Sequence, residues 1–299
     1  MLTAQSGVTP TRRKSNAPQM ATILCLNTGS SSLRIAAFGA TAAGLQTLRE
    51  RERVSVTREQ WLAQIGGLQP DFVVHRIVLG EREAETVEEC TPAVQARIAA
   101  RADLAPLHDR VALELTAQAR NAFPQARQLV AYDSAFHATI PVQRTTYAIP
   151  REWRERFGIE RIGYHGLSYA YAAQWLSEHG NPRRAICAHL GSGCSVAALV
   201  NGRSAATTMG FTPLEGLVMG TRSGSFDPGA LLYLMKKGVT YEALQIGLYQ
   251  ESGLKALCGD SDMRRVLQRA GDGNAEAKLA LDVFIESAAG GIAEMIAAA

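Results

Sequence analysis

Short apolar runs interrupted by polar turns occupy much of the first half of the chain, and longer segments with helical periodicity occupy much of the second half. Residues 23–38 predict strand, tight polar turn and strand, because apolar positions flank the polar stretch 27–32 on both sides. Gly29 permits positive φ at the bend. Serine hydroxyls and N–H groups, with Arg34 beside them, suit an anion. Taken alone, the same pattern also describes an ordinary serine-rich hairpin loop.

A second hairpin of the same plan follows at residues 185–200, where an apolar run, the turn Gly191-Ser192-Gly193 and another apolar run succeed one another. Two copies of one phosphate-type hairpin indicate a duplicated architecture, with two related lobes facing one ligand. A nucleotide would then lie in the cleft between the lobes.

The first half also predicts strands at 49–56, 71–80 and 128–131, and helices at 58–65, 91–103 and 110–123 separated by a break at 104–109. The strand at 71–80 is almost entirely apolar until His75 and Arg76. A buried, parallel-type strand that ends in cationic residues is typical of an active-site edge. Asp133 follows the strand at 128–131, where an acid is poorly placed for packing and well placed for a cleft.

The second half begins with a linker rich in Pro and Arg at 141–161, then a helix at 168–179. A tight Asn201-Gly202 turn leads into a strand at 203–208. Helices are predicted at 229–237, 240–251, 262–270 and 275–299. Strands that alternate with helices in both halves indicate an α/β fold with a sheet in each lobe. We expect an N-terminal lobe at 20–140 and a C-terminal lobe at 162–299.

Composition narrows the class of protein. A chain of 299 residues is long enough for two domains, and a net charge of +3 without blocks of like charge disfavours a nucleic-acid partner. No apolar run approaches the length needed to span a membrane. Five cysteines without metal-type spacing favour free thiols in a reducing compartment, hence a cytoplasmic location. Residues 1–19 lack the apolar core of a secretory signal, and we expect a disordered tail before a fold that begins at Met20.

Residues 207–228 closely resemble a signature of the acetate kinases, the acetokinase branch of the sugar kinase, heat-shock-70 and actin superfamily. Residues 27–33 resemble their other signature. Five further motifs fall in the family's order and spacing: residues 75–78, 105–108, 133–137, 164–166 and 189–193. Seven ordered motifs are far more specific than one glycine-rich loop.

The resemblance implies two ribonuclease-H-like (actin-like) lobes with a central cleft, the second lobe incomplete at its C-terminal end. It also implies that ATP and acetate give ADP and acetyl phosphate, with Mg²⁺ or Mn²⁺, in a protein that pairs as a homodimer. The chemistry of a carboxylate nucleophile supports the same reaction independently of the resemblance. An aliphatic carboxylate, with a pKa of roughly 4 to 5, is already a nucleophile at neutral pH and needs no general base. The obstacle is its approach to a polyanion, so catalysis should consist of charge neutralisation and alignment.

Roles for individual residues follow from the resemblance. Arg76 and Arg222 would lie on either side of the transferring phosphoryl group, because guanidinium forks match carboxylate and phosphate oxygens. His165 would donate a hydrogen bond to an equatorial phosphoryl oxygen. Asp133, with Asn27, would orient the metal or its waters. The structural alternatives are salt-bridged arginines, a helix-capping histidine and a helix N-cap aspartate.

The remaining assignments form two groups. The expected phosphate and ATP cradle consists of Asn27, Ser30, Ser32, Arg34, His189, Leu190, Gly191, Ser192 and Gly193, with His108 as a weaker candidate. The expected substrate site consists of Arg76 and a small apolar pocket for the acetate methyl formed by Val78, Leu107, Tyr164 and Pro213. Such a pocket discriminates by only about 1–3 kcal/mol per methylene, so propionate should also react.

The chain departs from the family pattern at four positions, where Arg34, Asp109, Tyr164 and Ser192 stand for the usual Lys, Asn, Phe and Asn. Family members also continue beyond the position of Ala299 into a strand, an adenosine-binding Gly-Gly-Ile-Gly-Glu-type loop and a magnesium-binding Glu. Three hypotheses therefore remain: an acetate kinase, a propionate or other short-chain fatty acid kinase, and an inactive truncated fragment that binds anions. An actin-like filament or chaperone ATPase is disfavoured, since those proteins lack the two arginines.

Overall fold

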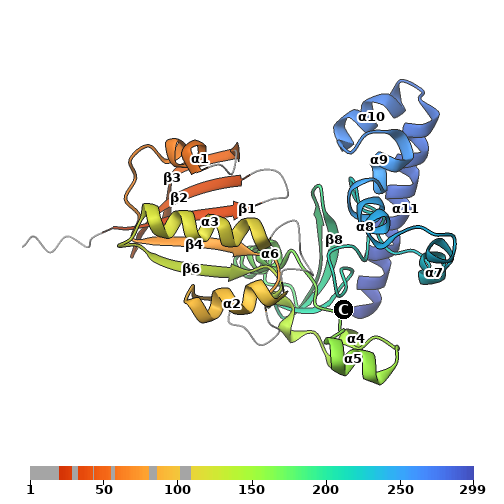
Figure 1. The fold of residues 1–299 in the computed structure, drawn as a ribbon, viewed down its shortest axis with the longest axis horizontal. Helices are drawn as coiled ribbons and strands as arrows, with labels where there is room; N and C mark the ends of the chain where they lie inside the picture. The colour runs from red at the N-terminus through yellow and green to blue at the C-terminus, as the bar shows by residue number, and fades with distance from the viewer. Residues whose placement is uncertain (1–19, 29–32, 43, 55–57, 81–85, 102–108) are drawn as a thin grey trace, which may run out of the picture.

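The computed structural model describes residues 20–28, 33–42, 44–54, 58–80, 86–101 and 109–299. Figure 1 shows an elongated molecule with one sheet and its helices at one end and a cluster of helices at the other. A second, smaller sheet and helix α6 (Gly166–Glu178) lie between them. The chain therefore has an α/β fold with a sheet in each half.

The first sheet has six strands in the order β3-β2-β1-β4-β6-β5. Their bounds are β1 Ala21–Thr28, β2 Leu33–Thr41, β3 Gly44–Val54, β4 Phe72–Ile77, β5 Val87–Glu89 and β6 Arg127–Tyr132. β1 and β2 form the predicted antiparallel hairpin, whereas β1, β4 and β6 run parallel to one another. Because parallel strands end at the same edge of a sheet, β1, β4 and β6 bring their carboxyl ends together.

The alternation of buried and partly exposed residues along the strands explains why helices pack against one face of this sheet. Alternate residues of β1 and β2 are buried, as expected for strands with one face on a core. They pack against α1 (Arg58–Ile65) and α3 (Asp109–Ala122), while α2 (Pro92–Arg101) covers the end of the sheet near β6. Trp61 of α1 is fully buried, and its indole N–H donates to Gln118 Oε1 of α3 at 2.9 Å.

The second sheet is antiparallel, with β8 (Cys194–Val200) between β7 (Arg184–Leu190) and β9 (Arg203–Thr207). Strand β8 is buried on both faces. Val196 and Ala198 belong to the core that includes Met295 of α11 (Ala275–Ala298), whereas Ala197 and Leu199 pack with Tyr169 of α6. The predicted second hairpin is therefore the centre of a layer covered by α11 on one side and α6 on the other.

All eight predicted helices occur within two residues of their expected ends: α1, α2, α3, α6, α7 (Pro228–Lys236), α8 (Tyr241–Gln250), α10 (Met263–Gly271) and α11. Outside 141–161, three short elements of the described chain were not predicted: β5, the 3₁₀ helix η2 (Ala135–Thr139) and α9 (Gly253–Cys258). Within 141–161 the chain forms two short helices, α4 (Val142–Thr145) and α5 (Arg151–Phe157). Elements this short depend on tertiary contacts more than on local periodicity.

The remaining predictions concern the cysteines, the N-terminal tail, two loops and membrane-spanning helices. All five cysteines are free thiols, as predicted. The expected tail at 1–19, the tip of the first hairpin and most of the break at 104–109 lie outside the described residues. Within the described chain, we find no helix that combines the length and the apolar character of a membrane span.

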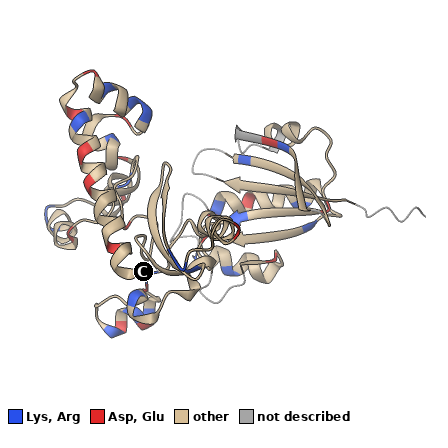
Figure 2. Cartoon of the chain, turned by 180° about the vertical axis from the view of Figure 1, so that it is seen from behind, with Lys and Arg blue, Asp and Glu red and all other residues tan. Residues whose placement is uncertain are grey.

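An ion-pair network joins the segment after α5 to the loop that follows β9. Arg161 donates to Glu215 Oε1 at 2.7 Å and to three successive carbonyl oxygens, those of Thr207, Thr208 and Met209. The Tyr147 hydroxyl donates to the other Glu215 oxygen. Figure 2 shows Lys and Arg residues in both halves of the molecule. Arg161 is mostly enclosed, with 19% of its side chain exposed.

We expect Arg161→Ala to lower the free energy of unfolding by about 2–3 kcal/mol, because it leaves the Glu215 carboxylate and several carbonyl groups without a charged donor. Arg151→Ala is the matched control, since the Arg151–Glu155 pair is exposed and joins residues four apart on one helix; its loss should cost under about 0.5 kcal/mol. Chemical denaturation measures both variants, and equal losses would contradict this interpretation.

Candidate active site

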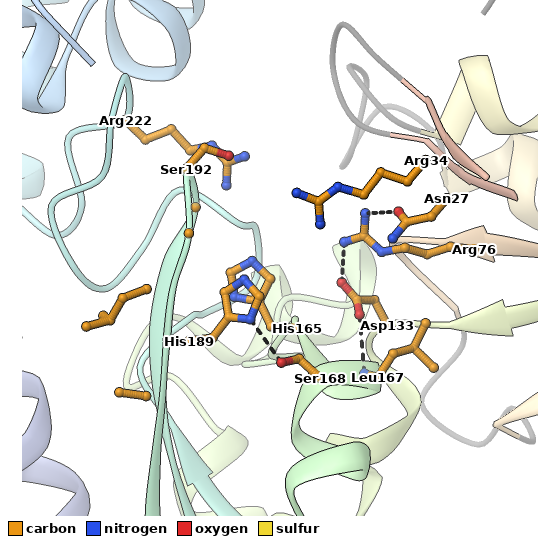
Figure 3. Close-up of a pocket in the computed structure, with 14 residues that line it drawn as sticks. Asn27, Arg34, Arg76, Asp133, His165, Leu167, Ser168, His189, Ser192 and Arg222 are labelled. Carbon is orange, nitrogen blue, oxygen red and sulfur yellow. Dashed lines mark hydrogen bonds and ion pairs between the residues drawn. The ribbon is translucent and has the colours of Figure 1, made fainter. Parts of the chain in front are cut away.

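A cavity of about 540 Å³ lies between the two lobes. Its wall is polar and contains residues from both hairpins, from the ends of β4 and β6 and from the start of α6 (Figure 3). The lining residues are Asn27, Arg34, Arg76, Asp133, His165, Leu167, Ser168, Ala188, His189, Leu190, Gly191, Ser192, Gly193 and Arg222.

The first-lobe wall is built around Arg76. Its guanidinium donates to Asp133 Oδ2 at 2.5 Å, to Asn27 Oδ1 at 3.2 Å and to the Thr28 carbonyl at 3.3 Å. These residues come from the ends of β4, β6 and β1, which the parallel pairing places side by side. The sheet topology therefore fixes one arginine, one carboxylate and one amide at a single point.

Asp133 also joins this wall to α6. The Gly166 N–H donates to the Asp133 main-chain oxygen at 2.7 Å, and the Leu167 N–H donates to Asp133 Oδ1 at 3.3 Å. A Cβ atom at Gly166 would lie 2.2 Å from that main-chain oxygen, so only glycine permits this approach. Burial alone would raise the pKa of the Asp133 carboxyl, but the guanidinium of Arg76 and the other donors lower it overall, which keeps Asp133 ionised.

The second-lobe wall carries two stacked histidines. The rings of His165 and His189 have centroids 4.1 Å apart and an interplanar angle of 21°. His165 has left-handed backbone angles, with φ of 61°, and its side chain does not cap the helix that follows. Burial, with the neighbouring His189, lowers the pKa of His165 to about 3, and burial also lowers that of His189. Both rings are therefore neutral at physiological pH.

Arg222 approaches the cavity from the second lobe. Its Nη1 atom donates to the Pro213 carbonyl at 3.0 Å and lies 3.7 Å from Met219 Sδ. None of the ion pairs found between described residues involves Arg222. In Figure 3 its guanidinium points across the cavity toward Arg34 and Arg76.

Gly193 lies against His165 and Arg222 at once. A Cβ atom on it would come within 3.3 Å of His165 Nε2 and 3.5 Å of Arg222 Nη1. A side chain at this position would therefore crowd the His165 ring and touch Arg222. With three arginines and a single carboxylate among the lining residues, the cavity suits a polyanionic ligand.

The Acetokinase family profile matches residues 66–299 of the chain. The chain belongs to the acetokinase family. It is 44% identical over 232 residues to the acetate kinase of Nostoc punctiforme, an alignment that covers 76% of this chain and 57% of that protein. The chain thus spans somewhat more than half the length of the curated relatives it matches.

Solved structures confirm the two-lobe α/β fold of this family member. The propionate kinase of Francisella tularensis superposes with a TM-score of 0.82 at 32% identity, covering 93% of this chain and 80% of the other. The acetate kinase of Porphyromonas gingivalis gives a TM-score of 0.77 at 28% identity, with the same coverage.

The structure brings together most of the residues that the sequence nominated. Eleven line the cavity: Asn27, Arg34, Arg76, Asp133, His165, His189, Leu190, Gly191, Ser192, Gly193 and Arg222. Ser30, Ser32, Leu107 and His108 lie outside the described residues. Val78 and Tyr164 are absent from the lining and lie in a buried cluster with Leu79 and Met209, and the Tyr164 hydroxyl donates to the Phe211 carbonyl. Pro213 meets the site through its carbonyl group, which accepts from Arg222.

Three lining residues, Leu167, Ser168 and Ala188, were not predicted. Each adjoins a predicted motif: the first two follow His165-Gly166, and Ala188 precedes His189. Ser168 Oγ lies 3.0 Å from His189 Nδ1, across the gap between α6 and β7. Proximity in sequence to a nominated histidine was the only available signal for these positions.

Asp109, one of the four departures from the family pattern, is completely buried. Its carboxylate accepts from the N–H groups of Val78 at 2.9 Å and Leu79 at 3.3 Å, so it ties the start of α3 to the chain that leaves β4. Burial raises the pKa of Asp109 from 3.8 to about 6, although the two N–H donors and Arg76 act in the opposite direction.

This raised pKa has a definite consequence for stability. The folded protein retains the Asp109 proton up to about pH 6, whereas the unfolded chain loses it near 3.8, so stability falls as pH rises through this interval. The Asp109→Asn variant has no titrating proton at this position. Relative to this variant, the free energy of unfolding of wild type should fall by about 2 kcal/mol between pH 4.5 and 7.5. Denaturant unfolding of both proteins across this range measures the difference; a difference independent of pH would contradict the assignment.

Proposed function

We propose that this chain acts in reversible transfer of the ATP γ-phosphoryl group to acetate, giving acetyl phosphate and ADP, the reaction of an acetate kinase. The observation that carries the proposal is the cavity itself, where arginines from two lobes converge and one ionised carboxylate holds one of them in place. Membership of the acetokinase family and the acetate and propionate kinases among its relatives support the same chemistry.

The proposed mechanism is direct in-line attack. A carboxylate oxygen of acetate forms the new bond to phosphorus as the bond to the ADP oxygen breaks, and no side chain needs to remove a proton. Arg76, oriented by Asp133, would hold the acetate carboxylate and the phosphoryl group, and Arg222 would neutralise the opposite side. His165, neutral at physiological pH, would donate to an equatorial phosphoryl oxygen of the transition state.

The acetokinase family implies a divalent metal, and the residues present fit one. Asn27 and Asp133 offer an amide and an ionised carboxylate oxygen at the cavity wall, and Mg²⁺ or Mn²⁺ is usually held by one or two carboxylates together with substrate phosphates and water. When bound, the metal would neutralise charge on the nucleotide phosphates.

The other assignments are proposals of the same kind. The ATP phosphates would lie against Asn27, Arg34, His189 and the stretch 190–193, where N–H groups of the glycine turn serve as donors. Ser30 and Ser32 would complete this cradle. Val78, Leu107, Tyr164 and Pro213 would surround the acetate methyl. We also propose lobes at 20–140 and 162–299 joined by 141–161, a cytoplasmic location and a homodimer, by analogy with the family.

A second candidate is a kinase for propionate or another short-chain fatty acid, which the likeness to the Francisella propionate kinase supports no better than acetate. Trapping of the acyl phosphate with hydroxylamine, in the presence of ATP and magnesium, distinguishes the candidates when acetate, propionate and butyrate are compared. We expect the highest kcat/KM with acetate. A higher value with propionate would favour the second candidate, and no acyl hydroxamate above the blank would favour an anion-binding fragment without activity.

A further inference from the structure

Two buried hydroxyl groups hold the His165 ring from the side away from the cavity. Ser195 Oγ lies 2.8 Å from His165 Nδ1, and the Tyr169 hydroxyl lies 2.5 Å from Ser195 Oγ. Neither Ser195 nor Tyr169 lines the cavity, and their exposed fractions are 0% and 1%. The other ring nitrogen, Nε2, lies beside Gly193, where the cavity begins.

The start of α6 and strand β8 bring these groups together. Tyr169 lies in the first turn of α6, and its main-chain N–H donates to the carbonyl of His165, the residue before the helix, at 3.1 Å. Ser195 lies on β8 and is two residues from Ala197, which faces α6 in the same core cluster as Tyr169. The hydroxyl of β8 therefore lies between the histidine and the tyrosine of α6.

The available protons allow only one satisfactory arrangement. Burial raises the pKa of Tyr169, which keeps its hydroxyl protonated. Among the described residues, the acceptor for the Tyr169 proton is Ser195 Oγ. Ser195 then donates its own proton to His165 Nδ1. If Ser195 instead donated its proton to the Tyr169 oxygen, the buried Tyr169 hydroxyl would have no acceptor in the described part of the chain, which is unfavourable.

We propose that Tyr169 and Ser195 are positioning residues that fix His165 in the tautomer with its proton on Nε2, so that the ring presents a donor to the phosphoryl group. The identity of this ligand rests on the proposed function, whereas the tautomer does not. Because a neutral imidazole has one donor and one acceptor, the opposite tautomer would turn a lone pair toward the phosphoryl oxygens. Burial, which lowers the pKa of His165 to about 3, ensures that the tautomer matters at neutral pH.

Long-range ¹H–¹⁵N correlation spectra of the full chain labelled with [¹⁵N]histidine test the proposal. The chain contains six histidines, and His165→Gln identifies the signals of interest. We expect protonated Nε2 and unprotonated Nδ1 for His165 in wild type. Ser195→Ala should produce a mixture of tautomers, and Tyr169→Phe, which keeps Ser195, should produce a smaller change in the same direction.

Ser204→Ala is the matched control. Ser204 Oγ lies 2.7 Å from His137 Nδ1 in an equally buried pair, and His137 Nε2 lies 2.9 Å from the Tyr164 carbonyl, away from the cavity. This variant removes a serine–histidine hydrogen bond of similar burial, so it should alter the signals of His137 and leave those of His165 unchanged.

Steady-state kinetics supply the second readout. Ser195→Ala should lower kcat for acyl phosphate formation roughly three- to tenfold with little change in KM, and Ser204→Ala should leave kcat unchanged. A His165 proton on Nδ1 in wild type, or an unchanged His165 tautomer in Ser195→Ala, overturns the proposal. The expected tautomer in a chain that forms no acyl phosphate would confirm the positioning and contradict the proposed function alone.

Discussion

Replacement of Arg222 by alanine should lower kcat for acyl phosphate formation by about 1,000-fold. An arginine that neutralises charge on a transferring phosphoryl group typically contributes at least this factor. Arg222 faces the cavity opposite Arg76, and its hydrogen bond to the Pro213 carbonyl holds the guanidinium there. Because most of its interaction energy should be realised in the transition state, KM for acetate should change far less than kcat.

Two companion variants make this prediction specific. Arg222→Lys keeps a charge but lacks the planar fork, so an intermediate loss of about 10- to 100-fold is expected. Arg264→Ala removes an exposed arginine of α10, whose partner Asp262 lies on the same surface, and should not change kcat. The free energy of unfolding of Arg222→Ala should stay within about 1 kcal/mol of wild type, because it loses one hydrogen bond to a carbonyl. Retention of more than a tenth of wild-type kcat in Arg222→Ala would contradict the role assigned to this residue.

Asp133→Asn should reduce both activity and stability. The carboxylate is buried and accepts from Arg76 at 2.5 Å, and removal of one partner from a buried ion pair typically costs about 3–5 kcal/mol. Arg76 would also lose the group that orients it, and misplacement of a reacting group by about 1 Å is enough to cost about 100-fold in rate. We therefore expect kcat to fall by at least about 100-fold. Steady-state kinetics measures this loss, and chemical denaturation of the same variant measures the loss of stability.

Asp227→Asn is a suitable control, because Asp227 is an exposed aspartate that accepts from a main-chain N–H at the start of α7, as Asp133 does at the start of α6. Its replacement should change neither kcat nor stability by a comparable amount. The double variant Arg76→Ala with Asp133→Asn should lose much less than the sum of the single losses, since the two residues act as one unit. Additive losses would show that they act independently.

Much of the site could be predicted from sequence because it depends on local signals. Both hairpins follow from alternating apolar residues around glycine turns, and the carboxyl ends of buried parallel strands indicated Arg76 and Asp133. The contact between these two residues could not be derived from the pattern, because they are separated by 57 positions and meet only through the pairing of β4 with β6.

The features that sequence analysis missed also depend on contacts between distant residues. The link from Tyr169 through Ser195 to His165 joins α6 to β8, and each residue alone looks like a core or turn position. Val78 and Tyr164, nominated for the methyl pocket, are buried in one cluster and do not line the cavity, and sequence alone gave no measure of this burial. Strand β5 contains only three residues, two of them Glu, so local propensity gave no sign of it.

The central claim is that arginines of both lobes act on one phosphoryl group, and ¹⁹F NMR with aluminium fluoride, ADP, magnesium and acetate tests it most directly. A metal fluoride that mimics the transferring phosphoryl group should bind most tightly where charge is stabilised in the transition state. We predict protein-bound fluoride resonances in wild type that disappear in Arg76→Ala and in Arg222→Ala. Absence of bound resonances in wild type, or their unchanged persistence in both variants, would contradict the account.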